Sequence, residues 1–131
     1  MDTPNPAPKG SILLVEDDEF LSGLLTQRLE EKGFAVATAK DGETAVSLAT
    51  EHVPDLLLLD IFLPGMSGFE AIAKLRQNEA TAKVPFMVLS NSAESQSKQE
   101  AEKLGAERYL VKAQVTPIEI VEVIDAWFKA K

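Results

Sequence analysis

Short apolar runs alternate with stretches of helical periodicity along almost the whole chain. The apolar runs predict five strands, over residues 12–15, 34–38, 55–60, 84–90 and 107–111. Four consecutive leucines fill the third run, which is typical of a strand buried on both faces of a parallel sheet.

Helical signals follow each of these runs. The predicted helices, with their caps, cover about 18–32, 41–51, 67–77, 92–104 and 116–129. Their predicted N-caps are Asp41, Ser67, Ser92 and Thr116. A glutamate three residues after Ser67 and after Thr116 favours a capping box at both places. Gly33 and Gly105 stand where two of the helices should end.

Regular strand–helix alternation predicts an α/β fold, a doubly wound five-stranded parallel sheet with helices on both faces. The flavodoxin-like strand order 2-1-3-4-5 is the expected arrangement. With 131 residues, one domain over 10–131 is expected, after a proline-containing disordered tail over 1–9. The last helix ends close to the final residue, so we expect no output domain within the chain.

Composition narrows the function further. The chain has no cysteine, which excludes disulfides and thiolate metal sites. A net charge of −8 disfavours direct binding to nucleic acids and to anionic membrane surfaces. No apolar run is long enough to span a bilayer, and the first residues do not form a secretory signal. We therefore expect a cytoplasmic protein.

Charged side chains follow three of the predicted strands. Glu16 and Asp17 follow the first, Asp60 follows the third, and Lys112 follows the fifth. The carboxyl ends of parallel strands share one edge, and strands one and three are neighbours in the expected order. Carboxylate oxygens suit Mg²⁺, so we predict Asp17 and Asp60 as direct ligands, Glu16 through water, and the backbone carbonyl of Phe62 as a further ligand.

Asp60 is also a candidate nucleophile, because carboxylates form acyl phosphates. Phosphoryl transfer requires in-line positioning and neutralisation of the phosphoryl oxygens. Mg²⁺, the Lys112 ammonium and the Ser90 hydroxyl would each hold one oxygen.

The ordered set Glu16-Asp17, Asp60, Ser90, Tyr109 and Lys112 resembles the receiver domain of bacterial two-component response regulators, including the single-domain chemotaxis type. The resemblance covers about residues 10–129, and the loop over 60–68 is similar to the phosphoacceptor loop of that family.

This resemblance implies a stand-alone phosphorylation switch. Asp60 would accept a phosphoryl group from a sensor histidine kinase or a histidine phosphotransfer protein. Ser90 and Tyr109 would be the switch residues, and Lys112 would sense the phosphoryl group. Partners would read the face made by the fourth helix, the fifth strand and the fifth helix. Catalysis would be limited to self-phosphorylation and slow autodephosphorylation, and the oligomeric state would be a monomer or a phosphorylation-dependent dimer.

The chain departs from the family pattern at three positions. Ala113 follows Lys112 where the family has a cis proline, and we expect a trans bond because a cis bond before a non-proline residue costs about 3–4 kcal/mol. Asn91 is larger than the usual residue after Ser90, so we expect it to narrow the approach to the phosphoryl group. The bulky Phe62 should exclude water and prolong the life of the phosphoryl group.

Four other interpretations remain open. A Mg²⁺-dependent hydrolase with an aspartate nucleophile generally has a second acid two positions later, but this chain has Phe62 there. A flavin-binding electron carrier shares the fold, but Glu16, Asp17 and Asp18 would repel its phosphate. The others are a degenerate receiver that takes no phosphate and a receiver fragment of a larger regulator.

Overall fold

The computed structural model describes residues 7–131. Its strands are β1 (Ser11–Val15), β2 (Ala35–Ala39), β3 (Leu56–Leu59), β4 (Phe86–Ser90) and β5 (Arg108–Val111). All of them pair in parallel in one sheet of order β2-β1-β3-β4-β5. The predicted doubly wound fold and its strand order are confirmed.

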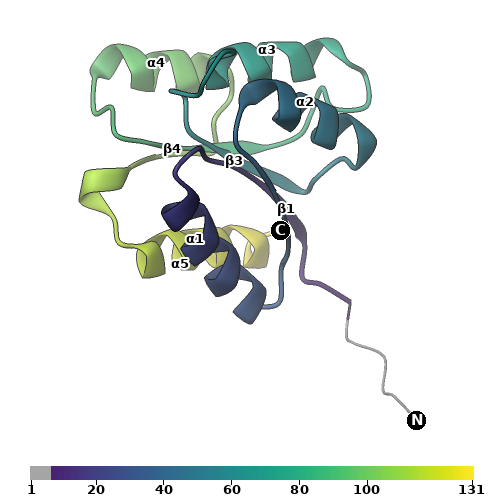
Figure 1. Cartoon of the computed structure of the whole chain (residues 1–131), viewed down its shortest axis with the longest axis vertical. Coiled ribbons are helices and arrows are strands. Elements are labelled where there is room, and N and C mark those ends of the chain that lie inside the picture. Colours follow the sequence, from purple (N-terminus) through teal and green to yellow (C-terminus); the bar gives the residue numbers. More distant parts are fainter. Residues whose placement is uncertain (1–6) are drawn as a thin grey trace.

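Five α-helices and one short 3₁₀ helix accompany the strands in the described part of the chain. They are α1 (Glu19–Glu31), α2 (Gly42–Glu51), α3 (Gly68–Gln77), α4 (Ser95–Lys103), the 3₁₀ helix η1 (Lys112–Gln114) and α5 (Pro117–Lys129). Helices α2, α3 and α4 cover one face of the sheet, and α1 and α5 cover the other (Figure 1). None of these helices has both the length and the apolar character needed to cross a membrane.

The four leucines of β3 divide between the two faces of the sheet. Leu57 and Leu59 pack in the core under α2, α3 and α4, whereas Leu56 and Leu58 pack in the core shared with α1 and α5. All four are almost fully buried. This is the burial on both faces that the uninterrupted leucine run predicts.

Strand β2 lies one residue later than predicted. Phe34 is buried, but its N–H donates to the Leu29 carbonyl at 3.1 Å as the chain leaves α1, so it is not part of the ladder. Gly33 makes this turn with φ of 100°, as its predicted place after a helix requires. At the other end of β2, Ala39 pairs with Val15.

Most predicted helix starts are confirmed. Asp41 Oδ1 accepts from the Thr44 N–H at 2.7 Å, and Ser67 Oγ accepts from the Glu70 N–H at 3.2 Å. Across residues 7–131, the reciprocal capping box forms only at Thr116, where Thr116 Oγ1 and the Glu119 carboxylate accept from each other's N–H at 3.2 and 2.9 Å.

The predicted start of the fourth helix is wrong. Helix α4 begins at Ser95, and its N-cap Glu94 makes no side-chain capping bond. Ser92 lies in the preceding loop, where its hydroxyl accepts from the Glu94 N–H at 3.3 Å. Local turn bonds therefore compete with the helix for this serine. The helix η1 was also not predicted.

Residues 1–6 of the predicted tail lie outside the described residues. Lys9 donates its N–H to the Gly33 carbonyl at 2.9 Å, and its ammonium lies 3.6 Å from Asp125. Those contacts fasten Lys9 to the α1–β2 turn and to α5.

Candidate functional site

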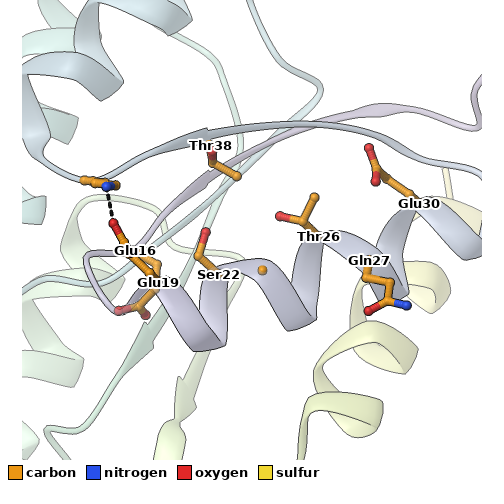
Figure 2. A pocket seen from close by; sticks show the side chains of 9 residues that line it. Glu16, Glu19, Ser22, Thr26, Gln27, Glu30 and Thr38 are labelled. Atoms are coloured by element: carbon orange, nitrogen blue, oxygen red, sulfur yellow. Dashed lines mark hydrogen bonds and ion pairs between the residues drawn. The ribbon is translucent and has the colours of Figure 1, made fainter.

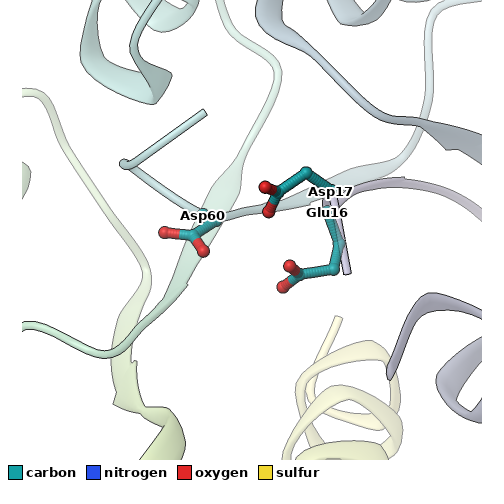
Figure 3. A group of neighbouring side chains, drawn as sticks. All are labelled: Glu16, Asp17 and Asp60. Atoms are coloured by element: carbon teal, nitrogen blue, oxygen red, sulfur yellow. The ribbon is translucent and has the colours of Figure 1, made fainter. Parts of the chain in front are cut away.

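Three carboxylates meet at the carboxyl edge of β1 and β3. Val15 pairs with Leu59, so the residues that follow them, Glu16 and Asp60, begin side by side. Glu16, Asp17 and Asp60 each place one carboxylate oxygen within 4.8 Å of the others (Figure 3). Glu16 and Asp60 are buried, whereas Asp17 is exposed.

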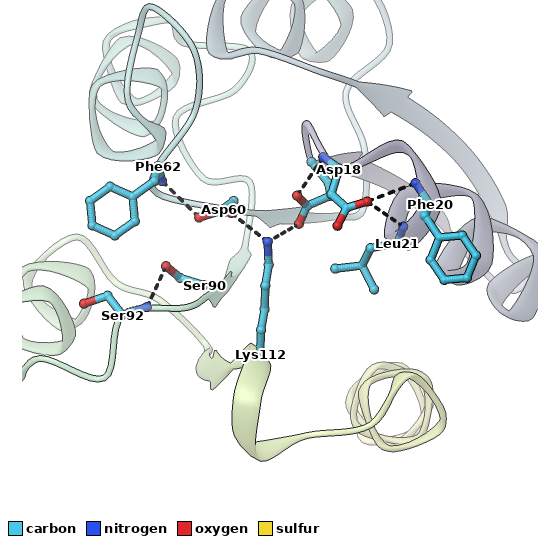
Figure 4. Close-up of polar contacts among 9 residues, drawn as sticks. Asp18, Phe20, Leu21, Asp60, Phe62, Ser90, Ser92 and Lys112 are labelled. Carbon is cyan, nitrogen blue, oxygen red and sulfur yellow. Dashed lines mark hydrogen bonds and ion pairs between the residues drawn. The ribbon is translucent and has the colours of Figure 1, made fainter.

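Lys112 projects into this cluster from the end of β5. Its Nζ lies 2.8 Å from Asp60 Oδ2 and 2.7 Å from Glu16 Oε1 (Figure 4). The side chain is only 16% exposed, so the ammonium meets the carboxylates largely away from water. One cation therefore bridges two of the three acids, and the exposed Asp17 does not share this bridge.

Backbone N–H groups hold the other oxygens of the two buried carboxylates. Asp60 Oδ1 accepts from the Phe62 N–H at 3.0 Å, and Glu16 Oε2 accepts from the Asp18 N–H at 3.1 Å. Asp18 in turn caps α1 by accepting from the N–H groups of Phe20 and Leu21. Each carboxylate is thus oriented by a backbone N–H two residues later in its own chain turn.

Two groups of this site, Glu16 and Lys112, have shifted pKa values. Burial raises the pKa of the Glu16 carboxyl, although the hydrogen bonds and charge of Lys112 and the Asp18 N–H oppose the rise. Burial by itself would lower the pKa of Lys112. The hydrogen bonds and charges of Asp60 and Glu16 outweigh it, and the pKa of Lys112 is raised. Lys112 is therefore a cation at neutral pH.

Gly68 is a site residue that the sequence pattern did not single out. Its N–H donates to the Ile61 carbonyl at 2.9 Å, which brings the start of α3 against the loop after β3. A Cβ at this position would lie 2.4 Å from the Asp60 carbonyl oxygen and 2.7 Å from the Ile61 Cα. Only glycine allows this close approach. In the sequence, the feature that could have indicated it is a glycine directly after the N-cap Ser67.

Ser90 on β4 and Tyr109 on β5 both hydrogen-bond to the loop after β4. Ser90 is fully buried at the end of β4, and its hydroxyl accepts from the Ser92 N–H at 3.3 Å. The Tyr109 hydroxyl donates to the Ser92 carbonyl at 2.7 Å. Ser92, which the sequence predicted as a helix cap, is therefore the residue that connects these two side chains.

Phe62 contributes its backbone to the site and not its ring. Phe62 is 64% exposed, and its ring points away from the Asp60 carboxylate (Figure 4). The described chain contains no cis peptide bond, so the Lys112–Ala113 bond is trans. The expectation of a trans bond at this position is confirmed. After it the chain turns into η1.

The donor set fits a hard divalent cation. All three converging groups are carboxylates, so the cluster offers only oxygen ligands, and Asp17 has an exposed carboxylate that is outside the Lys112 bridge. A small cation with several bound waters is compatible with such a half-open set.

A groove of about 390 Å³, lined mainly by residues with polar side chains, lies between α1 and β2 and adjoins the cluster (Figure 2). Glu16 lies at its edge, and the hydroxyls of Ser22, Thr26 and Thr38 line its length. Asp60 and Lys112 do not line it, so the groove is separate from the place where the acids and the ammonium meet.

The chain matches the response regulator receiver domain family over residues 12–125. It belongs to that family. Its curated relatives include the phosphate regulon transcriptional regulatory protein PhoB of Rhizobium meliloti, 42% identical over 81% of this chain and 47% of the relative. Protein PilH of Pseudomonas aeruginosa is 34% identical over 77% of this chain and 84% of its own length.

Solved receiver structures agree with this assignment. The non-phosphorylated HemR receiver domain from Leptospira biflexa has a TM-score of 0.82 and 31% identity, covering 90% of this receiver and 93% of that chain. The Vibrio cholerae chemotaxis protein CheY4 has a TM-score of 0.81 and 27% identity, covering 88% and 96%. This receiver spans about half the length of several curated relatives it matches, PhoB among them.

Proposed function

We propose that this receiver accepts a phosphoryl group on Asp60 and thereby changes which partner it binds. The observation that carries the proposal is the position of Lys112, whose ammonium lies 2.8 Å from Asp60 and 2.7 Å from Glu16 inside the acid cluster. A buried carboxylate next to a fixed cation and two further acids suits phosphoryl transfer, in which charge must be neutralised around the phosphorus.

The proposed donor is the phosphohistidine of a sensor histidine kinase or of a histidine phosphotransfer protein. An Asp60 oxygen forms the bond to phosphorus while the phosphorus–nitrogen bond of the donor breaks. The electron pair of that bond remains on the imidazole nitrogen. The Lys112 ammonium neutralises one phosphoryl oxygen, and the Ser90 hydroxyl turns from the Ser92 N–H to donate to another.

The proposed cofactor is Mg²⁺. Asp17 and Asp60 would hold it directly, Glu16 through water, and the Phe62 carbonyl would complete the protein ligands; the ion supplies positive charge to the phosphoryl oxygens. The support is the convergence of three carboxylates within 4.8 Å.

We propose that the phosphoryl group is long-lived. Phe62 offers neither an acid nor a hydrogen-bonding side chain two positions after Asp60, so nothing there orients an attacking water. The same absence argues against a hydrolase that turns over substrate, because a second acid would be needed to protonate the leaving group.

The signalling face would comprise α4, β5 and α5, with Ser90 and Tyr109 as switch residues. We propose a cytoplasmic protein that binds proteins rather than DNA, as a monomer or as a dimer formed on phosphorylation. Its similarity to PilH over most of that protein supports the stand-alone form. Its similarity to part of PhoB supports the alternative, a receiver within a longer regulator.

Intact mass after incubation with acetyl phosphate and Mg²⁺ tests the proposal. We expect one added phosphoryl group on the wild-type chain, and none on Asp60→Ala or in the presence of a chelator. An unmodified wild-type mass, for protein that circular dichroism shows to be folded, would overturn the proposal in favour of a degenerate receiver.

A further inference from the structure

The loop between β3 and α3 has two fixed ends and a middle without hydrogen bonds. At its start, the Phe62 N–H donates to Asp60 Oδ1 at 3.0 Å. At its end, the Gly68 N–H donates to the Ile61 carbonyl at 2.9 Å, which holds the two ends together. Within the described part of the chain, no hydrogen bond joins residues 63–66 to another segment. Packing therefore decides where the middle of this loop lies.

The middle of the loop rests on the first turn of α2. Gly42, the first residue of that helix, is buried. A Cβ at Gly42 would lie 2.8 Å from the Met66 carbonyl oxygen and 3.1 Å from the Met66 Cβ. The backbone of the loop thus fills the space that any side chain at position 42 would need.

Space, and not backbone conformation, is what requires a glycine at this position. Gly42 is not among the glycines with positive φ in the described chain. The helix cap does not require it either, because the Asp41 carboxylate makes the cap by accepting from the Thr44 N–H at 2.7 Å. Alanine would favour the helix over glycine. The close approach of Met66 accounts for the glycine at the start of α2.

A side chain at position 42 would disturb one part of the site and spare the rest. Gly68 packs against the Asp60 backbone and is joined to Ile61, so the ends of the loop resist a push on Met66. The displacement would fall on the middle of the loop and on Phe62, which precedes it. The other two acids and the ammonium follow β1 and β5, so the loop does not carry them.

We propose that Gly42 is a positioning residue for the cation site. The inference rests on the proposed function, in which the Phe62 carbonyl is a ligand of Mg²⁺. The absence of a side chain on Gly42 lets the loop settle on α2 and thereby places the Phe62 backbone beside Asp60. Gly42 touches none of the reacting groups and acts through Met66. It sets the affinity for Mg²⁺ and has little part in phosphoryl transfer itself.

The test compares the wild type with Gly42→Ala in two assays. Isothermal titration calorimetry measures Mg²⁺ binding to the unphosphorylated protein, and intact mass with acetyl phosphate gives the phosphorylation rate over a range of Mg²⁺ concentrations. We expect Gly42→Ala to bind Mg²⁺ about tenfold more weakly, the usual loss when the support of a metal ligand is changed. At saturating Mg²⁺ its rate should stay within about twofold of the wild-type rate, because only metal binding is weakened.

Two variants show whether the effect belongs to this contact. Met66→Ala keeps the backbone carbonyl that rests on Gly42 and should bind Mg²⁺ as the wild type does. Ala49→Gly weakens α2 near its other end, so it should lower the melting temperature without changing the affinity for Mg²⁺. Sucrose favours the folded state and is added equally to all samples, with folding checked by circular dichroism. In metal-free protein, amide exchange at Phe62 should be faster in Gly42→Ala than in either control.

The outcomes separate the role of Gly42 from the proposed function. If the wild type takes no phosphoryl group from acetyl phosphate with Mg²⁺, the proposed function is overturned, and the role of Gly42 with it. If the wild type is phosphorylated but Gly42→Ala binds Mg²⁺ equally well, only the role of Gly42 is overturned. The same conclusion follows if either control weakens Mg²⁺ binding as much, or if Gly42→Ala does not fold in sucrose, because its role would then be general packing.

Discussion

The two sides of the site are held together very differently. On the β1–β3 side, the half-buried Lys112 ammonium joins two buried carboxylates at 2.7 and 2.8 Å, and backbone N–H groups fix the remaining oxygens. On the β4–β5 side, Ser90 reaches its loop through a 3.3 Å bond, and α4 has one buried residue and no side-chain cap. Charge and burial make the first side rigid, whereas weak neutral bonds leave the second easy to rearrange.

This difference matches two tasks that make opposite demands on structure. Group transfer requires reacting groups held in place to within a fraction of an ångström. A switch requires an element with two arrangements of similar free energy. The division suggests that chemistry takes place on the rigid side and that α4 reports it.

The largest expected effect comes from removing the charge that the rigid side shares. Lys112→Met should slow phosphorylation by acetyl phosphate about a hundredfold, the usual loss when one donor to a developing anion is removed. Time courses of intact mass at fixed Mg²⁺ measure this rate. Ser92→Ala serves as the matched change on the other side and should leave the rate nearly unaltered. If the two variants lost the same share of the phosphorylation rate, the proposed difference between the two sides would be wrong.

Backbone packing at the rigid side should tolerate almost no added volume. Gly68→Ala places a methyl group 2.4 Å from the Asp60 carbonyl oxygen, so we expect a loss of about 1–3 kcal/mol of unfolding free energy together with slower phosphorylation. Urea unfolding gives the first value and intact mass the second.

Gly23→Ala is the control, since a methyl group there meets nothing within 4 Å in the middle of α1. It should stabilise the protein by about 1 kcal/mol, because alanine favours a helix over glycine. A Gly68→Ala variant as stable as Gly23→Ala would show that the backbone at the start of α3 moves aside at little cost in free energy.

Alkaline pH should weaken the rigid side selectively. The pKa of folded Lys112 is raised above its ordinary value of 10.5, so its ion pairs contribute full stability below that value. The contribution is lost as pH rises through the raised pKa. Urea unfolding below and above pH 10.5 should therefore show a steeper fall for the wild type than for Lys112→Met. Parallel curves would mean that the ammonium contributes no pH-dependent stability.

The smallest effect should come from giving α4 the cap that it lacks. Glu94→Asp places a short carboxylate at the N-cap, which should stabilise the helix start by about 0.5–1 kcal/mol. Slower amide exchange in the first turn of α4 would report this gain, with Glu94→Ala as the uncapped control. If Asp and Ala behave alike, the start of α4 is set by tertiary contacts and not by its cap.

The sequence was enough to predict three features. They are the strand order, the burial of the β3 leucines on both faces of the sheet, and the convergence of Glu16, Asp17, Asp60 and Lys112. Each depends on strong, short-range signals: uninterrupted apolar runs, helix periodicity, and charged residues directly after strands. Parallel strands bring their carboxyl ends to one edge whatever the details of packing, so the placement of charges followed from topology alone.

Four features could be seen only in the tertiary structure. They are the start of α4, the helix η1, the close approach of Gly68 and the contacts of Ser92. Ser92 has the residue type of an N-cap, yet Tyr109, seventeen positions away, and Ser90 take its backbone groups into the loop. Gly68 is required by the Asp60 carbonyl oxygen, which lies in the loop after β3. Local patterns determine which elements form and where the charges emerge, whereas competing hydrogen bonds between distant segments decide where a weak helix begins, because those alternatives differ by only about 1 kcal/mol.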